Sequence, residues 1–253
     1  MKAFWAMTKK EFLESIRTYK LFIVVVVFLL FGMLNPITAK IMPKLLASFM
    51  PEGMTVTLAV EPHAIDSWIQ FYKNMSTQLI LFIVVFSGIV ANDLSKGTLI
   101  NMLTKGLARK TVILSKFTAT ISLWSVSYLI CFGTTYAYTT YLLPGELSNM
   151  AFSAFCMWIF GVLQITIMLL GGVLFGNIYG SLLLTSGFTG LLMLFNIVPK
   201  FAEHSPYLLS SENVPLLAAK ADVSDFYVPI VITLVLIFFF LASSVASFDR
   251  KQI

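Results

Sequence analysis

Six long apolar runs constrain what this chain can fold into more than any other feature of its sequence. A helix that crosses a bilayer needs about 20 consecutive apolar residues, and no run has Asp, Glu, Lys, Arg or His in its central part. Only 11% of all residues are charged, compared with about 25% in soluble domains. The runs cover approximately residues 21–39, 75–91, 112–142, 151–175, 181–198 and 227–246. We therefore expect an all-α integral membrane protein, with residues 1–253 forming a single transmembrane domain.

The distribution of lysine and arginine predicts how the chain is oriented. Cytoplasmic loops carry an excess of these residues, and an even number of spans places both termini on the same side. Twelve of the 17 basic residues fall on the side of the termini: Lys2, Lys9, Lys10, Arg17, Lys20, Lys96, Lys105, Arg109, Lys110, Lys116, Arg250 and Lys251. The other side has five: Lys40, Lys44, Lys73, Lys200 and Lys220. We expect a bacterial plasma membrane protein with both termini in the cytoplasm.

Residues 1–19 precede the first run and have an amphipathic pattern. The apolar side chains of Trp5, Phe12 and Leu13 fall along one helical stripe together with Ile16, while most of the charged residues fall elsewhere. A helix with one apolar and one charged face lies in the plane of a membrane interface. We expect a cytoplasmic elbow helix here, although a soluble cap that folds onto the other loops would have the same pattern.

The sequence lacks the common motifs of catalysis. It contains neither H-E-x-x-H nor G-x-S-x-G, and no glycine is followed by the lysine that a P-loop requires. The two histidines, His63 and His204, lie in different predicted loops. The two cysteines, Cys131 and Cys156, lie inside predicted spans, where packing is their ordinary role. We expect no catalytic residue, no metal ligand and no cofactor bound by this chain.

The predicted cytoplasmic loop over residues 92–111 begins with the sequence NDLSKGTLINMLTKG. Thr98 is a suitable helix N-cap, and Leu99 and Leu103 belong to an apolar set at helical spacing. Gly106 can end a helix in the left-handed conformation. The short helix predicted here is either a docking element or an ordinary connector that rests on the bilayer. Because a connector needs only a few residues, the length of the loop favours docking.

The same region resembles the signature of type-2 permeases of ATP-binding-cassette (ABC) exporters. Residues 89–117 read IVANDLSKGTLINMLTKGLARKTVILSKF. In that signature an acidic residue stands four positions before a Gly-Thr pair, and an apolar run, an Arg-containing turn and a Lys that opens the third span follow. The matching residues are Asp93, Gly97, Thr98, Arg109 and Lys116. The chain departs from the pattern twice, with Asp93 in place of Glu and Gly106 in place of Pro.

The resemblance extends to the topology, through the elbow helix, the six spans, a long extracellular loop over residues 200–226 and the missing ATPase motif. It implies that residues 92–111 contain a coupling helix, which docks on a separate ABC-type ATPase subunit that binds ATP and Mg. The implied coupling residues are Asp93, Gly97, Thr98, Leu99, Ile100, Leu103 and Arg109. A second permease subunit, identical or different, would complete the membrane part. Lipid would surround it, and nothing in the sequence points to nucleic acid.

The resemblance also implies which side chains face a substrate pathway, because it places the first, second and fifth spans at the centre of the permease dimer. The pathway residues expected on these spans are Phe28, Phe31, Gln78, Phe82, Phe86, Phe188 and Asn196. A pathway lined by these residues would desolvate a charged solute without providing an opposite charge. We therefore expect export of a hydrophobic or amphipathic compound. A toxin-like or bacteriocin-like peptide comes first, and an antibiotic, another drug or a lipid second.

Other functions remain open from the sequence alone. A secondary carrier or channel is disfavoured because the spans lack ionisable residues at mid-membrane, and an intramembrane enzyme is disfavoured by the missing catalytic motifs. The same apolar pathway residues are also compatible with a mechanical role in which the protein transports no solute.

Three local features complete the expectations. The Asn35–Pro36 pair predicts a kink near the end of the first span. The aromatic-rich residues 62–73 are expected at the outer interface. A third feature, a set of glycines spaced four apart at the end of the fourth run, serves either close helix packing or a hinge; these are Gly172, Gly176 and Gly180.

Overall fold

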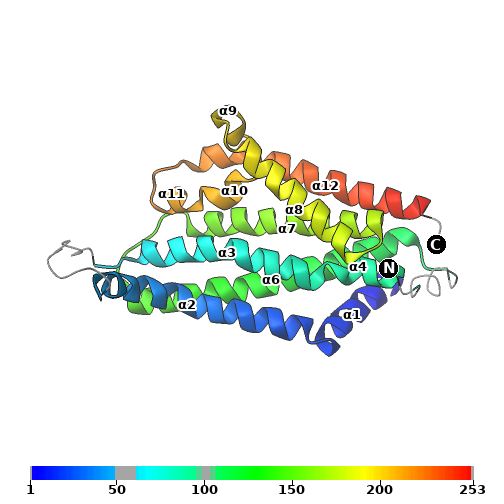
Figure 1. The fold of residues 1–253 in the computed structure, drawn as a ribbon, viewed down its shortest axis with the longest axis horizontal. Coiled ribbons are helices and arrows are strands. Elements are labelled where there is room, and N and C mark those ends of the chain that lie inside the picture. The colour runs from blue at the N-terminus through cyan, green and yellow to red at the C-terminus, as the bar shows by residue number, and fades with distance from the viewer. Residues whose placement is uncertain (1, 49–60, 96, 98–103, 105, 252–253) are drawn as a thin grey trace.

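The computed structural model describes residues 2–48, 61–95, 97, 104 and 106–251 (Figure 1). All regular secondary structure within these residues is helical. The elements are α1 (Lys2–Arg17), α2 (Lys20–Ser48), α3 (Ala64–Phe86), α4 (Gly88–Ser95), α6 (Arg109–Leu142), α7 (Met150–Phe175), α8 (Ile178–Phe195), α9 (Pro199–Ala202), α10 (Leu208–Ser211), α11 (Asn213–Leu217), the 3-10 helix η1 (Val223–Phe226) and α12 (Tyr227–Arg250).

Six helical segments of the described chain are long and apolar enough to cross a membrane. They are Lys20–Pro43, Ala64–Ser95, Arg109–Leu142, Met150–Phe175, Ile178–Phe195 and Val223–Arg250. The expectation of an all-helical chain with six candidate spans is confirmed at this level. The remaining sequence predictions concern where each span begins, how the helices pack and what the loops do.

The second span begins earlier than the sequence suggests. It starts at Ala64 rather than near residue 75, so most of residues 62–73 form the first turns of α3. Their expected place at the outer interface stays a prediction. Trp68 and Phe71 are fully buried in the bundle. The polar side chain of Asp66 is satisfied locally, because its carboxylate accepts a hydrogen bond of 2.9 Å from the backbone N–H of His63 at the helix start. The average hydropathy of the segment therefore understates its helical and buried character.

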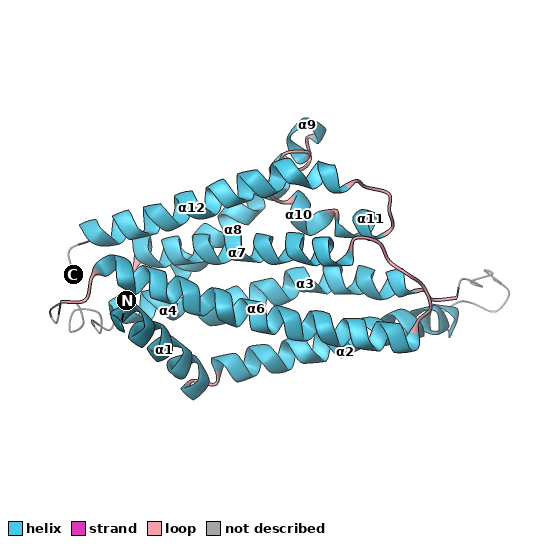
Figure 2. Ribbon diagram, turned by 180° about the vertical axis from the view of Figure 1, so that it is seen from behind, coloured by secondary structure: helices cyan, strands magenta, loops and turns pink. Residues whose placement is uncertain are grey.

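The helices form an elongated bundle with α7 near its centre (Figure 1). α2 packs against α6 and α3, while α7 packs against α12 and α8. Seen from behind, α6 crosses the middle of the bundle between α2 and α7 (Figure 2). We use the term near end for the end that holds α1, α4, the start of α6 and the end of α12. The far end is the opposite one, where α6 ends and α7 begins.

α2 runs through both of its prolines as one helix, which the sequence does not predict for Pro36. A proline cannot donate the hydrogen bond to the carbonyl four residues earlier, which here belongs to Gly32. The hydroxyl of Thr135 on α6 donates to this Gly32 carbonyl at 3.1 Å and accepts a bond of 3.2 Å from the Asn35 amide. Asn74 on α3 donates to Asn35 at 2.8 Å. The Thr135 side chain on α6 thus replaces the bond that Pro36 removes, and Asn74 on α3 is linked to it through Asn35.

Replacing Thr135 with Val should destabilise the bundle, because the shape is kept while the Gly32 carbonyl and the Asn35 amide lose a partner. A buried group left without its hydrogen bond costs about 1–3 kcal/mol. The measurement is denaturant unfolding of the purified protein in mixed micelles. Thr134→Val is the matched control, since the Thr134 hydroxyl bonds only to the Ile130 carbonyl of its own helix turn among the described residues. Equal stability of the two variants would contradict the proposed replacement of the missing bond.

The glycines at the end of α7 have structural reasons to be small. Gly176 ends α7 with a φ of +67°, in the left-handed region that favours glycine. A Cβ on Gly172 would lie 3.3 Å from the Cβ of Val90 on α4, and a Cβ on Gly180 would meet Phe175. These contacts support the packing interpretation of the three glycines.

The segment between α8 and α12 folds back onto the bundle. Its short helices α10 and α11 contact α7 and α3, and Leu209, Leu216 and Phe226 are fully buried. Asn213 is also buried, and its side-chain oxygen lies 3.2 Å from the hydroxyl of Ser153 on α7. The region expected as an extracellular loop is therefore a packed cap over one part of the far end.

Candidate functional site

The near end of the bundle brings together segments that are distant in the sequence. Both ends of the described chain lie there, with α4 and the start of α6 beside them (Figure 1). The loop that joins α4 to α6 is the region that carries the ABC permease resemblance. Charged side chains connect the two sides of this loop to the neighbouring helices.

Lys116, about two turns into α6, is the centre of a buried charge cluster. Its side chain has 0% exposure, and its ammonium donates three hydrogen bonds. The acceptors are the Glu11 carboxylate on α1 at 2.9 Å, the Asp93 carboxylate on α4 at 2.6 Å and the Ile89 carbonyl at 2.7 Å. All three protons of the ammonium therefore have an acceptor. One lysine joins α1, α4 and α6.

Lys10 adds a second cation on the more exposed side of the cluster. Its ammonium lies 2.7 Å from Glu14, 3.1 Å from Glu11 and 3.6 Å from Asp93. Burial acts to lower the pKa of Lys10, but the hydrogen bond to Glu14 and the charges of Glu11 and Asp93 outweigh it and raise the pKa above its ordinary value. Three carboxylates and two ammonium groups thus stabilise one another in a partly dry environment.

The cluster explains how α1 sits on the bundle. The helix buries its Glu11 face, together with Ser15, against α6. Three residues of its apolar stripe remain outside, with Trp5, Leu13 and Ile16 all exposed, while Phe12 packs against the core. A soluble helix would bury its apolar stripe, so this reversed arrangement fits a helix whose apolar face meets lipid.

Two further cations cap helix C-termini at the same end. Arg109, the first residue of α6, donates to the carbonyls of Phe248, Asp249 and Lys251 at the end of α12, at 2.8, 3.1 and 2.6 Å. The Lys251 ammonium donates to the Val173 carbonyl in the last turn of α7 at 2.6 Å. Basic groups at these positions satisfy free carbonyls and complement the negative end of the helix dipole. Burial lowers the pKa of Lys251.

The structure places the predicted coupling residues in two groups. Asp93 belongs to the buried cluster, Arg109 caps α12, and Gly97 adopts a left-handed φ of +65° shortly after α4. The other four lie outside the described residues: Thr98, Leu99, Ile100 and Leu103. The proposed amphipathic helix in this loop therefore stays a prediction.

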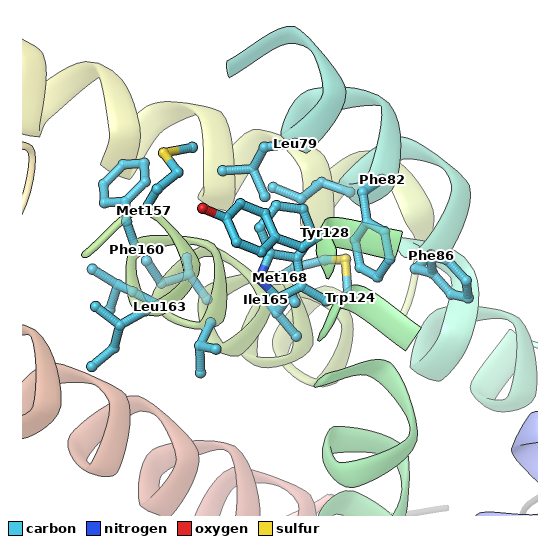
Figure 3. Packing of buried hydrophobic residues seen from close by; sticks show 14 of the residues in the cluster. Leu79, Phe82, Phe86, Trp124, Tyr128, Met157, Phe160, Leu163, Ile165 and Met168 are labelled. Atoms are coloured by element: carbon cyan, nitrogen blue, oxygen red, sulfur yellow. The ribbon is translucent and has the colours of Figure 1, made fainter. Parts of the chain in front are cut away.

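Most of the predicted pathway residues lie in the core of the chain. Phe28 and Phe82 contact the Trp124 ring edge-on, with ring centroids 5.9 and 5.4 Å away, and Phe86 lies 4.6 Å from Phe82. These three phenylalanines are fully buried, and Figure 3 shows Phe82 between Trp124 and Phe86. Phe31 is partly buried against the same cluster. The second, third and first spans thus share an aromatic core within one chain.

The remaining pathway residues are placed differently. Gln78 on α3 is buried, and its amide has no hydrogen-bond partner of good geometry among the described residues, although the weakly polar Cys131 thiol lies close by. Phe188 packs on Phe240 of α12, with ring centroids 5.3 Å apart. Asn196 ends α8 as its C-cap residue. The α8 residues therefore do not belong to the aromatic core around Trp124.

Comparison with known proteins gives a distant relative. No family model matches the chain. The chain is similar to the uncharacterized transmembrane protein YxlG of Bacillus subtilis (strain 168), with 23% identity over 233 residues that cover 88% of each chain. The chain is a multi-pass membrane protein. Its six candidate spans and this distant relationship agree on that point.

Sequence reasoning missed most members of the charge cluster. The amphipathic pattern predicts that the charged residues of α1 lie on its polar face, whereas Glu11 is buried and pairs with Lys116. A signal was present, since Lys116 lies inside an apolar run and a lysine placed there needs a counter-charge. The resemblance indicated both Asp93 and Lys116 but gave no reason to pair them.

Proposed function

We propose that this chain is the transmembrane permease subunit of an ABC exporter, driven by a separate ATPase subunit. The observation that carries the proposal is the 2.6 Å contact between Asp93 and Lys116. Both residues match positions of the permease signature, and most of the loop lies between them in the sequence. The contact ties the two ends of a proposed docking loop to each other and to α1.

The near-end contacts support a mechanical role for this loop. A movement of the loop would act on α4 through Asp93 and on α6 through Lys116, and Glu11 would carry it to α1. The Arg109 cap would carry it to α12, and the Lys251 cap would link α12 to α7. Closely packed ion pairs transmit a movement of the loop to the helices, because packed interfaces shift between discrete arrangements and do not deform continuously.

The function assigned to the partner follows from this role. ATP and Mg bind to the ATPase, whose closure pushes on the loop, in keeping with the lack of a P-loop sequence in this chain. A second permease subunit, identical or different, completes the membrane part. The exported compound is hydrophobic or amphipathic, with a toxin-like or bacteriocin-like peptide first and a drug or lipid second. A buried amide without a good partner, that of Gln78, offers one polar point among the aromatic rings of the spans.

Replacing both Leu99 and Leu103 with Asp should abolish docking of the ATPase while leaving the spans inserted. The apolar stripe read from the sequence is then charged, and a desolvated charge at an interface costs several kcal/mol. The measurement is co-purification of an ABC-type ATPase with the tagged chain, followed by ATP hydrolysis of the reconstituted complex. Lys110→Asp, which changes an exposed charge at the same end, is the control. An ATPase that co-purifies equally with the double mutant and drives undiminished transport would contradict the docking role.

The proposed orientation places the near end in the cytoplasm. Ser95 near the loop and Ser211 in the α10 region are both exposed, and the native Cys131 and Cys156 are buried. In intact cells an impermeant thiol reagent should label Ser211→Cys and leave Ser95→Cys unlabelled, with labelling of both after lysis. Labelling of Ser95→Cys alone in intact cells would reverse the orientation.

A further inference from the structure

An apolar groove of about 670 Å3 lies between the far halves of α6 and α7. One wall is a helical stripe on α6 that includes Leu129, Phe132 and Tyr136. The other wall is a stripe on α7 that includes Ala151 and Phe155. Both helices are candidate spans, so the groove opens along a surface that a bilayer would contact.

The groove is about as long as one lipid leaflet is thick. Its α6 wall extends from Ser125 to Tyr136, which corresponds to about 16 Å at a rise of 1.5 Å per residue. Half of a hydrocarbon core of about 30 Å is about 15 Å. A single acyl chain of the leaflet at the far end therefore matches the groove in both length and polarity.

A second cavity of about 450 Å3 continues the groove at the far end. The two share Tyr136 and Met150 in their linings. The second cavity differs in chemistry, because the exposed Glu146 carboxylate and the Thr140 hydroxyl line it. An apolar groove that leads into a polar cavity at the end of the spans has the polarity gradient of an amphipathic molecule.

The second cavity offers an acceptor to a cationic head group. The exposed Glu146 carboxylate accepts hydrogen bonds and carries a negative charge, as an ammonium group requires. A primary ammonium can donate to this carboxylate, whereas a quaternary ammonium has no N–H to donate. A head group with a primary ammonium therefore fits this cavity.

We propose that α6 and α7 hold one phospholipid with a primary ammonium head group in the leaflet at the far end. One of its two acyl chains lies in the groove, where van der Waals packing with the aromatic walls retains it, and the other remains in the bilayer. Its head group lies in the second cavity, with the ammonium at Glu146. This site is separate from the aromatic core around Trp124, and it does not depend on an ATPase partner.

The test is native mass spectrometry of the full-length protein, delipidated in detergent and titrated with phosphatidylethanolamine, phosphatidylcholine or phosphatidylglycerol of identical chains. One phosphatidylethanolamine per chain should remain bound at collision energies that remove the other two lipids. Ala151→Trp, which fills the groove, should lower this binding at least tenfold. Leu183→Trp, which introduces the same side chain at an exposed position of α8 outside the groove, should leave it unchanged.

Glu146→Gln should remove the preference for phosphatidylethanolamine while keeping chain binding, which separates the head-group site from the groove. Thermal unfolding followed by circular dichroism confirms that each variant is folded. Equal binding of all three lipids to the wild-type protein would overturn the head-group assignment. The groove assignment would be overturned if Ala151→Trp retained phosphatidylethanolamine as well as the wild-type protein does. It would also be overturned if the wild-type protein were a dimer that Ala151→Trp dissociates without loss of lipid.

Discussion

Replacing Lys116 with Met should lower the free energy of unfolding by about 3–5 kcal/mol, the usual cost of removing one partner from a buried ion pair. The loss is large because Glu11 and Asp93 keep their charges in a site that is 3% and 8% exposed. Lys10 compensates only in part, since it lies 3.6 Å from Asp93. Unfolding in mixed micelles and the yield of monodisperse protein are the two measurements.

Two comparisons make this prediction specific. Lys110→Met removes an exposed lysine at the same end of α6, and it should change stability by less than about 0.5 kcal/mol. The triple variant Lys116→Met, Glu11→Gln, Asp93→Asn removes the unpaired charges and should recover much of the lost stability. In the proposed complex this triple variant should still hydrolyse ATP without transport, because the connection between the loop and α1 is gone. If Lys116→Met alone were as stable as Lys110→Met, the charge cluster would not form.

Replacing Arg109 with Met should cost about 2–3 kcal/mol, because hydrogen bonds from a charged donor contribute more than neutral ones. One guanidinium nitrogen serves the carbonyls of Phe248, Asp249 and Lys251, and the group also lies 5.9 Å from the Phe248 ring. Hydrogen exchange should then increase in the last turn of α12 more than in any other span. The readout is exchange followed by mass spectrometry.

The control for this variant is Arg250→Met, which changes an exposed arginine at the same helix end. Arg109→Lys should be intermediate, because lysine keeps the charge but lacks the planar set of donors. If exchange at the end of α12 rises equally in Arg250→Met, the cap does not stabilise the helix in the way described.

The sequence predicts the spans well and the polar contacts poorly, and the reason is physical. An apolar run long enough to cross a bilayer has few alternatives to a helix, so all six appear. The start of α3 was missed because Asp66 and Ser67 lower the local hydropathy, although Asp66 caps the helix and Ser67 bonds to Thr139 at 2.6 Å. Hydropathy does not record whether a polar group is satisfied.

The charge cluster depends on contacts between residues that are far apart in sequence. Glu11 and Lys116 are separated by 105 positions, and no local pattern relates them. The continuity of α2 at Pro36 depends in the same way on Thr135, which lies on another helix. Periodicity describes one helix at a time, so it predicts the faces of α1 but not which face a neighbouring charge will attract.

The position of Lys116 in the chain has a consequence for biosynthesis. Both of its carboxylate partners, Glu11 and Asp93, precede it in the sequence, so the ribosome has already made them when Lys116 emerges. The lysine can therefore be neutralised as soon as it emerges from the ribosome, before α7 and α12 are complete. The caps on α7 and α12 need Lys251, which follows both helices in the sequence. The charge cluster at the near end can thus form during translation before these caps do.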